Sequence, residues 1–335
     1  MNPIQTTTGG GAQAFVAQLN PTGSTLLFSS LFGGGGNLGS QSAAGLAVDS
    51  QGNIYLAGNT NAGSLAITPG AFQPVFGKGQ GVGAGFVAKI SPPSSTPAIA
   101  PSVGVVSGAS FQAGIVPSSW ITIVGTNLSL KTDTWDNAVV NGTLPTSLDG
   151  VSVSVGGLPA YISYISPGQI NALAPNVGPG NLSVTVTNAS GTSSPVTAVA
   201  QMLQPAFFLF GNYAVATRTD YTLAVKDGTF PGSPTVAAKP GEVIVLWGTG
   251  FGPTSPPAPT GIVVPSGAYN TANAVTVTVG PAAVVVYGAA LTSGEVGLYQ
   301  VAIQIPTTLA DGDYPVVATV SGAQSPATTL ITVQK

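Results

Sequence analysis

The stretch that decides the fold is PSSWITIVGTNLS, Pro117–Ser129, because a related stretch, PGEVIVLWGTGFG, returns at Pro240–Gly252. Both stretches place a short run rich in Ile and Val before a glycine-containing turn, which is the pattern of a β-strand that ends in a turn. The second stretch begins 123 residues after the first, at position 240 instead of 117. One strand pattern that returns at this distance indicates an internal duplication.

Further blocks of the two copies follow in the same order. They pair VSVSVGG (Val151–Gly157) with VTVTVGP (Val275–Pro281), QINALAP (Gln169–Pro175) with QVAIQIP (Gln300–Pro306), and GNLSVTVTNASGTSSPV (Gly180–Val196) with GDYPVVATVSGAQSPA (Gly312–Ala327). Each copy has about seven short alternating strands separated by turns, the pattern of an immunoglobulin-like sandwich. We therefore predict one Ig-like sandwich at residues 102–204 and a second at 205–335, with Trp120 and Trp247 as core or sub-core anchors.

The composition favours an all-β protein. Charged residues make up 5% of the chain, whereas an ordinary soluble domain has about a quarter. A surface helix needs a charged or polar stripe, and the sequence has no such stripe of useful length. No run of about 18 apolar residues occurs, so we expect no membrane span. The net charge of −3 and the lack of a basic run argue against nucleic acid as a partner.

The first ninety residues contain a shorter repeat. FVAQLNPTGS, which begins at Phe15, returns in part as FVAKISPPSS, which begins at Phe86. Short strands separated by turns predict a β-meander over residues 1–92, with one set of four strands and the first strand of a next set. In the turn DSQGN we expect Asp49 to accept backbone N–H groups. The proline-rich residues 93–101 are predicted to form an extended linker.

Two parts of the chain resemble known families. GLAVDSQGNIYLAGNT (Gly45–Thr60) with ITPGAFQ (Ile67–Gln73) resembles the β-propeller repeat of secreted proteins from Acidobacteria and relatives, which implies a four-stranded blade. The blocks after residue 100 resemble the Solibacter-type C-terminal domain of secreted proteins of unknown function, and also the transcription-factor-type Ig folds of surface proteins. The resemblance implies an extracellular or cell-surface protein, although the N-terminus lacks the pattern of a signal peptide.

The residue types leave little room for catalysis. The chain contains no histidine and no cysteine, which removes the commonest general base and the thiolate and imidazole metal sites. A carboxylate-pair hydrolase is the remaining enzyme alternative, and Glu242 and Glu295, the two glutamates, are expected to be solvated turn and edge residues instead. The acids of Asp133–Asp136 and Asp311–Asp313 lack the density of a calcium loop. We predict no enzymatic activity, no catalytic residues, no metal and no cofactor.

These observations predict a non-enzymatic extracellular structural protein that self-assembles through strand-edge contacts into a surface filament or layer. The expected partners are other copies of the chain, as a homopolymer. The candidate contact residues lie on two edge strands: Phe15, Val16, Leu19, Phe86, Val87 and Ile90. The alternative is an adhesion or carbohydrate-binding surface module with surface glycans as partners. The candidates for its aromatic platform are Tyr161, Tyr164, Tyr287 and Tyr299, although we expect most of them to pack in the strand cores instead.

Overall fold

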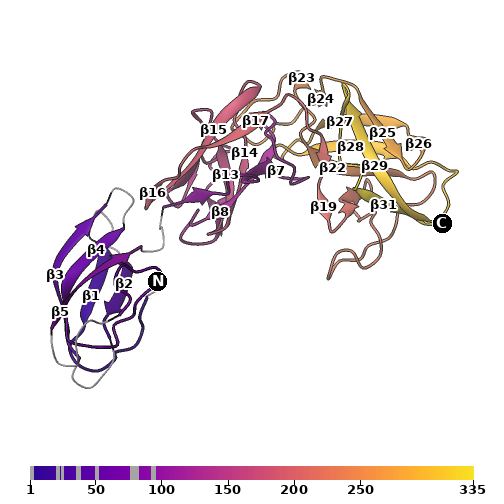
Figure 1. Ribbon diagram of the computed structural model, residues 1–335. Coiled ribbons are helices and arrows are strands. Elements are labelled where there is room, and N and C mark those ends of the chain that lie inside the picture. The colour runs from indigo at the N-terminus through magenta and orange to yellow at the C-terminus, as the bar shows by residue number, and fades with distance from the viewer. Residues whose placement is uncertain are drawn as a thin grey trace. The chain divides into compact units, whose positions relative to one another are not determined.

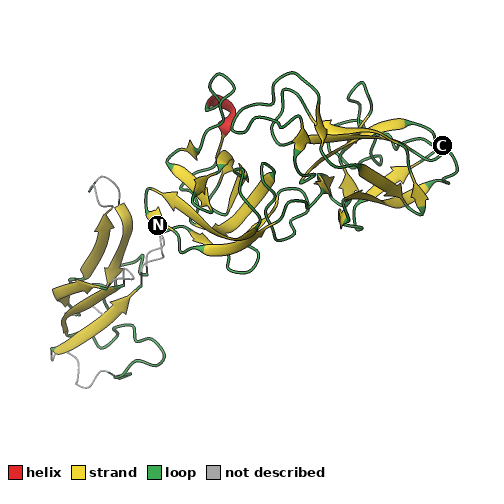
Figure 2. Ribbon diagram, turned by 90° about the horizontal axis from the view of Figure 1, so that it is seen from above, coloured by secondary structure: helices red, strands yellow, loops and turns green. Residues whose placement is uncertain are grey.

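The computed structural model describes residues 4–19, 23, 26–34, 39–49, 53–75, 83–91 and 96–335. The chain divides into two compact units, Met1–Ser95 and Thr96–Lys335. Figure 2 shows that the regular structure is almost entirely strand, with one helical turn, η1 (Trp135–Asn137). The predicted all-β fold is confirmed. Among the described residues, no helix has the length and apolar character needed to cross a membrane.

The described residues of the N-terminal unit form five strands in two sheets (Figure 1). The first sheet is the hairpin of β1 (Ala14–Leu19) and β2 (Leu26–Phe32), and the second is the meander of β3 (Gln41–Val48), β4 (Ile54–Thr60) and β5 (Ala84–Ile90). Neighbouring strands are antiparallel in both sheets. The strands that were expected to form one four-stranded blade are therefore divided between two sheets.

The position of β5 differs from the one that the repeat predicts. Its sequence echoes β1 and was expected to open a next blade, but it pairs with β4 along its whole length. This pairing sets Ile90 opposite Ile54, and both side chains are buried. Burial of apolar surface favours this arrangement over a strand that waits for a further blade.

A small apolar core lies between the two sheets. Its buried members are Val16, Phe28, Ile54, Leu56 and Ile90. The rings of Phe32 and Phe86 pack against it with their centroids 5.3 Å apart. Gly58 lies opposite Phe86, and a Cβ at Gly58 would lie 2.8 Å from the Phe86 ring and 2.1 Å from the Ser42 carbonyl oxygen. The glycine is therefore required for β3 and the ring to approach β4.

Asp49 holds the turn between β3 and β4. Its Oδ1 accepts the backbone N–H of Asn53 at 2.9 Å, and its Oδ2 accepts the Asn53 side-chain amide at 2.8 Å. The predicted role of Asp49 is confirmed. Residues 50–52 of this turn and residues 93–95 of the predicted linker lie outside the described residues.

The first sandwich of the C-terminal unit consists of two six-stranded sheets. One sheet contains β10 (Ser147–Leu148), β11 (Val151–Val155), β12 (Leu158–Pro159), β15 (Gly180–Asn188), β16 (Gly191–Thr192) and β17 (Val196–Ala200). The other contains β6 (Ala98–Ile99), β7 (Val105–Ser107), β8 (Trp120–Thr126), β9 (Asp133–Thr134), β13 (Tyr161–Ile165) and β14 (Gln169–Leu173). Both sheets contribute to one buried core.

The second sandwich has two seven-stranded sheets. One contains β18 (Ala206–Phe207), β21 (Ala216–Thr217), β22 (Val243–Thr249), β23 (Thr254–Ser255), β24 (Tyr269–Thr271), β27 (Val286–Leu291) and β28 (Tyr299–Gln304). The other contains β19 (Leu209–Phe210), β20 (Tyr213–Ala214), β25 (Val275–Val279), β26 (Ala282–Ala283), β29 (Gly312–Val320), β30 (Ala323–Gln324) and β31 (Leu330–Val333).

Corresponding blocks of the internal repeat form corresponding strand pairs. In the first sandwich β8 pairs with β14 and β11 with β15, and in the second β22 pairs with β28 and β25 with β29. Along β11 the three valines are buried and the two serines are half-buried. The period of two in the sequence thus places one face of each strand in a core.

Direct bonds join the two sandwiches into one unit. The backbone N–H of Leu144 donates to the carbonyl of Gly261 at 2.9 Å, and that of Val263 donates to the carbonyl of Gly142 at 2.8 Å. The intervening residues Thr143 and Ile262 form an antiparallel bridge. A short two-stranded ribbon therefore spans the junction.

The two tryptophans predicted as core or sub-core anchors lie outside the main cores of the two sandwiches. Trp120, the first residue of β8, packs with Leu144, Leu173 and Val296 in an apolar cluster at the junction. Its backbone N–H donates to Thr249 Oγ1 at 3.1 Å, and its indole N–H donates to the Val296 carbonyl at 2.7 Å. In β22 the neighbours Ile244 and Leu246 point into the core, so the alternation directs Trp247 to the opposite face. Trp120 therefore anchors a smaller buried cluster outside the main core, and Trp247 does not belong to the core of its sandwich.

Candidate functional site

The six predicted contact residues divide into inward and outward side chains. Val16 and Ile90 are buried in the N-terminal core, and Phe86 packs against that core. Phe15 is 72% exposed, Val87 is 79% exposed, and Leu19 also points outward. Both the inward and the outward group have members on β1 and on β5, and these two strands belong to different sheets. The structure therefore does not gather the six residues into one patch, and their role in subunit contacts stays a prediction.

Strand β3 is a further exposed edge that sequence reasoning missed. Only Gln41 of its eight residues is buried. Leu46 and Val48, whose partners Leu56 and Ile54 are core residues, remain exposed. The available signal was the strand's composition: QSAAGLAV has no alternation of apolar and polar residues and no charge.

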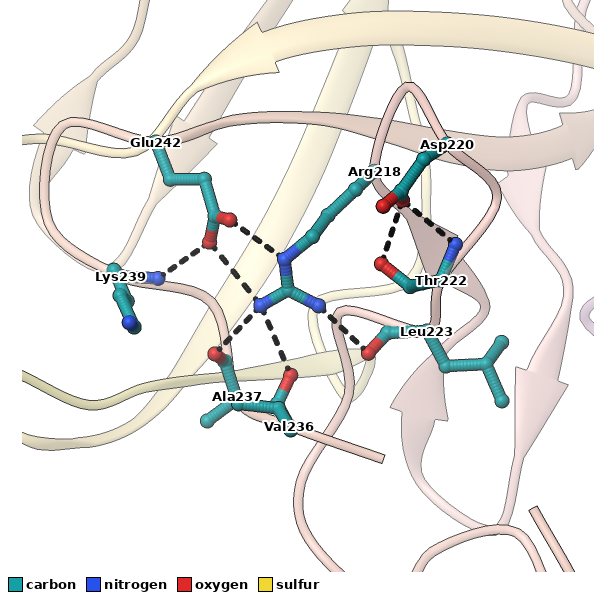
Figure 3. Close-up of polar contacts among 8 residues, drawn as sticks. All are labelled: Arg218, Asp220, Thr222, Leu223, Val236, Ala237, Lys239 and Glu242. Carbon is teal, nitrogen blue, oxygen red and sulfur yellow. Dashed lines mark hydrogen bonds and ion pairs between the residues drawn. The ribbon is translucent and has the colours of Figure 1, made fainter. Parts of the chain in front are cut away.

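Glu242 is held in a clamp by Arg218 (Figure 3). The Arg218 Nε donates to Glu242 Oε1 at 2.6 Å, and its other nitrogens donate to the carbonyls of Leu223, Val236 and Ala237 at 2.9, 3.3 and 3.1 Å. The Glu242 Oε2 accepts the backbone N–H of Lys239 at 2.8 Å. The bonds join both ends of the long segment between β21 and β22, so the clamp is structural.

Glu242 and Glu295 do not form the pair that a hydrolase needs. Glu242 lines a shallow pocket of about 560 Å³ beside Arg218 and Tyr221. Glu295 lines a different pocket of about 380 Å³ beside Trp120 and Trp135. Two carboxylates in separate pockets cannot act on one bond as acid and nucleophile or as acid and base.

Two acids, Asp133 and Asp149, share ion pairs with one lysine. Lys131 Nζ lies 2.8 Å from Asp149 and 3.5 Å from Asp133. The backbone N–H of Thr134 and then the Asp149 side chain hold the pKa of Asp133 below its ordinary value. The ammonium group thus supplies the positive charge at this cluster. In the described part of the chain, no three acidic side chains gather where they could share a metal ion.

Asp313 is the centre of a second polar cluster, on β29. Its Oδ1 accepts the Thr332 hydroxyl at 2.6 Å, and its Oδ2 accepts the Tyr213 hydroxyl at 2.8 Å and lies 3.1 Å from Lys226 Nζ. The Thr332 hydrogen bond, followed by those of Tyr213 and Lys226, holds the pKa of Asp313 below its ordinary value. The cluster ties β20 and β31 to β29.

The Asp313 cluster gives the stability a pH dependence. The ordinary pKa of aspartate is about 3.9. Because the pKa of Asp313 in the folded state is lower, its carboxylate stabilises the fold above about pH 4. This stabilisation is lost as the pH falls toward the folded-state pKa. We expect Asp313→Asn to lower the free energy of unfolding by about 1 kcal/mol at pH 7. Urea denaturation should show this difference shrinking at pH 3.

Asp227→Asn is the matched control for this measurement. Asp227 is exposed and makes no hydrogen bond or ion pair within the described residues. Its replacement should leave the urea midpoint unchanged at both pH values. A difference between Asp313→Asn and the wild type that stays constant from pH 7 to pH 3 would contradict the assignment.

The four tyrosines proposed as a sugar platform are not alike. Tyr299 is buried, its hydroxyl donates to the Gly252 carbonyl, and burial raises its pKa. Tyr161 packs at the junction cluster. Tyr287 is exposed and donates to Gln304. Tyr299 therefore cannot offer its ring to a ligand at the surface.

Two family models match parts of the chain. The model of the beta-propeller repeat matches residues 28–66, and that of the IPT/TIG domain matches residues 89–199. At this level the expected propeller-type repeat and Ig-like domain are confirmed. No curated protein matches the chain.

Several solved structures show a remote likeness. A surface glycan-binding protein from the mixed-linkage glucan utilization locus of Bacteroides ovatus is 13% identical, with a TM-score of 0.31, over 88% of this chain and 54% of that one. The surface glycan-binding protein PbSGBP-B of Prevotella bryantii is 14% identical, with a TM-score of 0.19, over 68% and 40%. Domains 5–6 of the S-layer protein SbsC are 13% identical, with a TM-score of 0.25, over 71% and 98%. The chain spans about half the length of the first of these proteins. It joins a segment that matches a beta-propeller repeat to a segment that matches an IPT/TIG domain.

Proposed function

We propose that the protein is a non-enzymatic structural component of the extracellular space or cell surface, and that it self-associates through the N-terminal unit into a filament or layer. In this proposal the tandem sandwiches form a stiff support, and the N-terminal unit supplies the contacts between copies. The observation that carries the proposal is the exposed, uncharged strand β3 beside a very small core.

The strand edges of the N-terminal unit support the proposal. Within the described residues, β1 and β2 form a sheet of their own, so each has one open side, and β3 and β5 are the outer strands of the second sheet. An open edge presents backbone N–H and C=O groups that pair readily with a strand of another chain.

The side chains along these edges offer little protection against pairing. Natural edge strands are usually blunted by charged residues or proline. Strands β1, β2 and β3 contain neither, and β5 contains one charge, Lys89. The Lys89 ammonium lies over the Tyr55 ring, 5.6 Å from its centroid. The edges are therefore suited to close contact with another uncharged strand.

Exposed apolar side chains add a second contribution. Phe15, Leu19, Leu46, Val48 and Val87 all point to solvent in this unit, while its core has five buried residues. Covering such side chains contributes about 25 cal/mol per Å² of apolar surface. Association would thus bury surface that the small core leaves uncovered.

The test is the particle size of charged variants. We expect the wild-type protein to form species larger than a monomer in light scattering after size-exclusion chromatography, with a proportion that rises with concentration. Phe15→Lys or Val87→Lys should shift the protein toward monomer, because each places a charge on an outward face of an edge strand. Electron microscopy of the wild type would then show the form of the assembly.

Val285→Lys serves as the control. Val285 is 55% exposed in the second sandwich, and a lysine there adds the same charge to a different unit of the chain. Because the proposal assigns the contacts to the N-terminal unit, this variant should assemble like the wild type. A wild-type protein that remains monomeric at every concentration and salt level, or an equal effect of Val285→Lys, would refute the proposal.

A further inference from the structure

The pocket at the junction of the two sandwiches has an unusual lining. Its volume is about 380 Å³, within the range of small-molecule sites. Trp120 and Trp135 lie in it edge to face, with ring centroids 5.6 Å apart and an interplanar angle of 64°. Glu295 also lines it, and the remaining lining residues are aliphatic or glycine.

The charge of the pocket is uncompensated. Glu295 is exposed and makes no ion pair within the described residues, and no lysine or arginine is among the residues that line the pocket. An indole face carries negative electrostatic potential and attracts cations, more strongly than other aromatic side chains do. Two indoles and one carboxylate therefore give the pocket a uniform preference for positive charge.

We propose that this junction pocket binds a weakly hydrated organic cation, a quaternary ammonium or guanidinium group, against the Trp120 and Trp135 rings and beside the Glu295 carboxylate. A compact ammonium group is strongly hydrated and loses more on entering an apolar pocket than a guanidinium group does. The aliphatic lining accommodates the methyl or methylene groups that such cations carry.

The hydrogen-bonding capacity of the pocket disfavours a neutral saccharide. A sugar ring has several hydroxyl groups, and each one buried without a partner carries a cost. The Trp120 indole N–H is already bonded to the Val296 carbonyl. Among the side chains that line the pocket, the Trp135 indole N–H and the Glu295 carboxylate remain as hydrogen-bonding groups. Two such groups are too few for a saccharide and enough for a cation.

The three tryptophans of the chain provide the test. Their indole N–H signals in NMR spectra of the full chain can be assigned with Trp135→Phe and Trp247→Phe. We expect tetramethylammonium and choline to shift the Trp120 and Trp135 signals with saturation near about 1 mM, compared with sodium chloride at the same ionic strength. Trp247, bonded to Thr217 outside this pocket, is the internal control and should not move.

Other ligands and variants separate the contributions. The neutral isostere of choline, 3,3-dimethylbutan-1-ol, should bind about tenfold more weakly. N-acetyl-arginine amide tests whether the cation can be a protein side chain. Binding as strong as that of choline would point to a basic partner chain. If N-acetyl-arginine amide does not bind, the ligand is a small-molecule ammonium. Glu295→Gln should weaken choline binding about threefold, whereas Asp227→Asn should have no effect.

Several outcomes would overturn the proposal. These are equal effects of tetramethylammonium and sodium chloride, equal binding of the neutral isostere, or an unchanged affinity in Glu295→Gln with its melting temperature preserved. Saturable binding of a neutral oligosaccharide such as cellotetraose without binding of choline would replace the cation by a saccharide. Each result is independent of self-association, which involves the N-terminal unit.

Discussion

Trp120→Ala should lower the free energy of unfolding of the tandem sandwiches by about 3 kcal/mol. The substitution removes one of the two indole side chains of the junction cluster, which also contains Leu144, Leu173 and Val296. It also leaves the Val296 carbonyl without the indole donor at 2.7 Å. Cavity formation and a lost hydrogen bond act in the same direction.

Gly297 shows how closely this junction is packed. A Cβ at Gly297 would lie 2.3 Å from Leu173 Cδ1 and 3.3 Å from the Trp120 indole nitrogen. The Trp120 ring also lines the junction pocket of about 380 Å³, so its removal gives up these close contacts and enlarges a space that is already open. The expected loss therefore includes most of the cavity contribution.

Urea denaturation followed by circular dichroism measures the effect. Trp120→Phe is the informative companion, because it keeps an aromatic ring and removes the N–H donor, and should cost about 1 kcal/mol. Trp247→Phe removes a hydrogen bond to Thr217 within the second sandwich and leaves the junction intact. If Trp120→Ala unfolds at the wild-type midpoint, the junction contributes nothing to stability.

Arg218→Ala should cost a similar amount, about 3 kcal/mol. The side chains of Arg218 and Glu242 are 19% and 22% exposed, so the pair is largely shielded from water. Removal of the guanidinium leaves the Glu242 carboxylate without its cation, and the carbonyls of Leu223, Val236 and Ala237 without their donors. Unpaired groups of this kind are the costly part of a broken ion pair.

Arg218→Lys separates charge from geometry. A lysine keeps the positive charge, but it lacks the planar fork that reaches a carboxylate and several carbonyls at once. We expect it to recover less than half of the loss. Lys131→Ala, at an exposed ion pair, should leave the midpoint unchanged. Limited proteolysis should cut Arg218→Ala between β21 and β22, and resistance equal to that of the wild type would contradict a clamping role.

The period of two in the sequence was sufficient to predict the sandwiches. In VSVSV of β11 every valine is buried, and the corresponding VTVTV of β25 buries Val277 and Val279. The repeated blocks also predicted which strands correspond, because each pair of blocks contains one pair of long strands, such as β15 and β29. These features are local, and a single sequence contains all the information they require.

The junction and the clamp could not be predicted in the same way. Leu144 and Val296 lie in connecting segments, where an isolated apolar residue has no periodic signal, and they are buried because two sandwiches meet. Arg218 and Glu242 are 24 positions apart, across a segment without alternation. Their contact depends on how the loop folds back, which the residue types alone do not determine.

The N-terminal unit shows a third limit on what the sequence can predict, which is the pairing partner of a repeated strand. The echo of β1 in β5 is real in the sequence, and the expectation of a further blade followed from it. The structure instead pairs β5 with β4, because Ile90 and Phe86 complete a core that would otherwise lack two large side chains. A repeat identifies a strand, but it does not identify the partner of that strand.

The bulge in β3 determines how a neighbouring strand would have to align. Between Ala43 and Gly45 the strand carries one extra residue relative to β4, so its pleat changes phase there. A strand shifted by one residue exchanges its two faces, and along an uncharged edge no ion pair would oppose the shift. The irregularity at Ala44 therefore provides a fixed reference point, and an assembly built on this edge should have one axial repeat instead of a mixture of repeats.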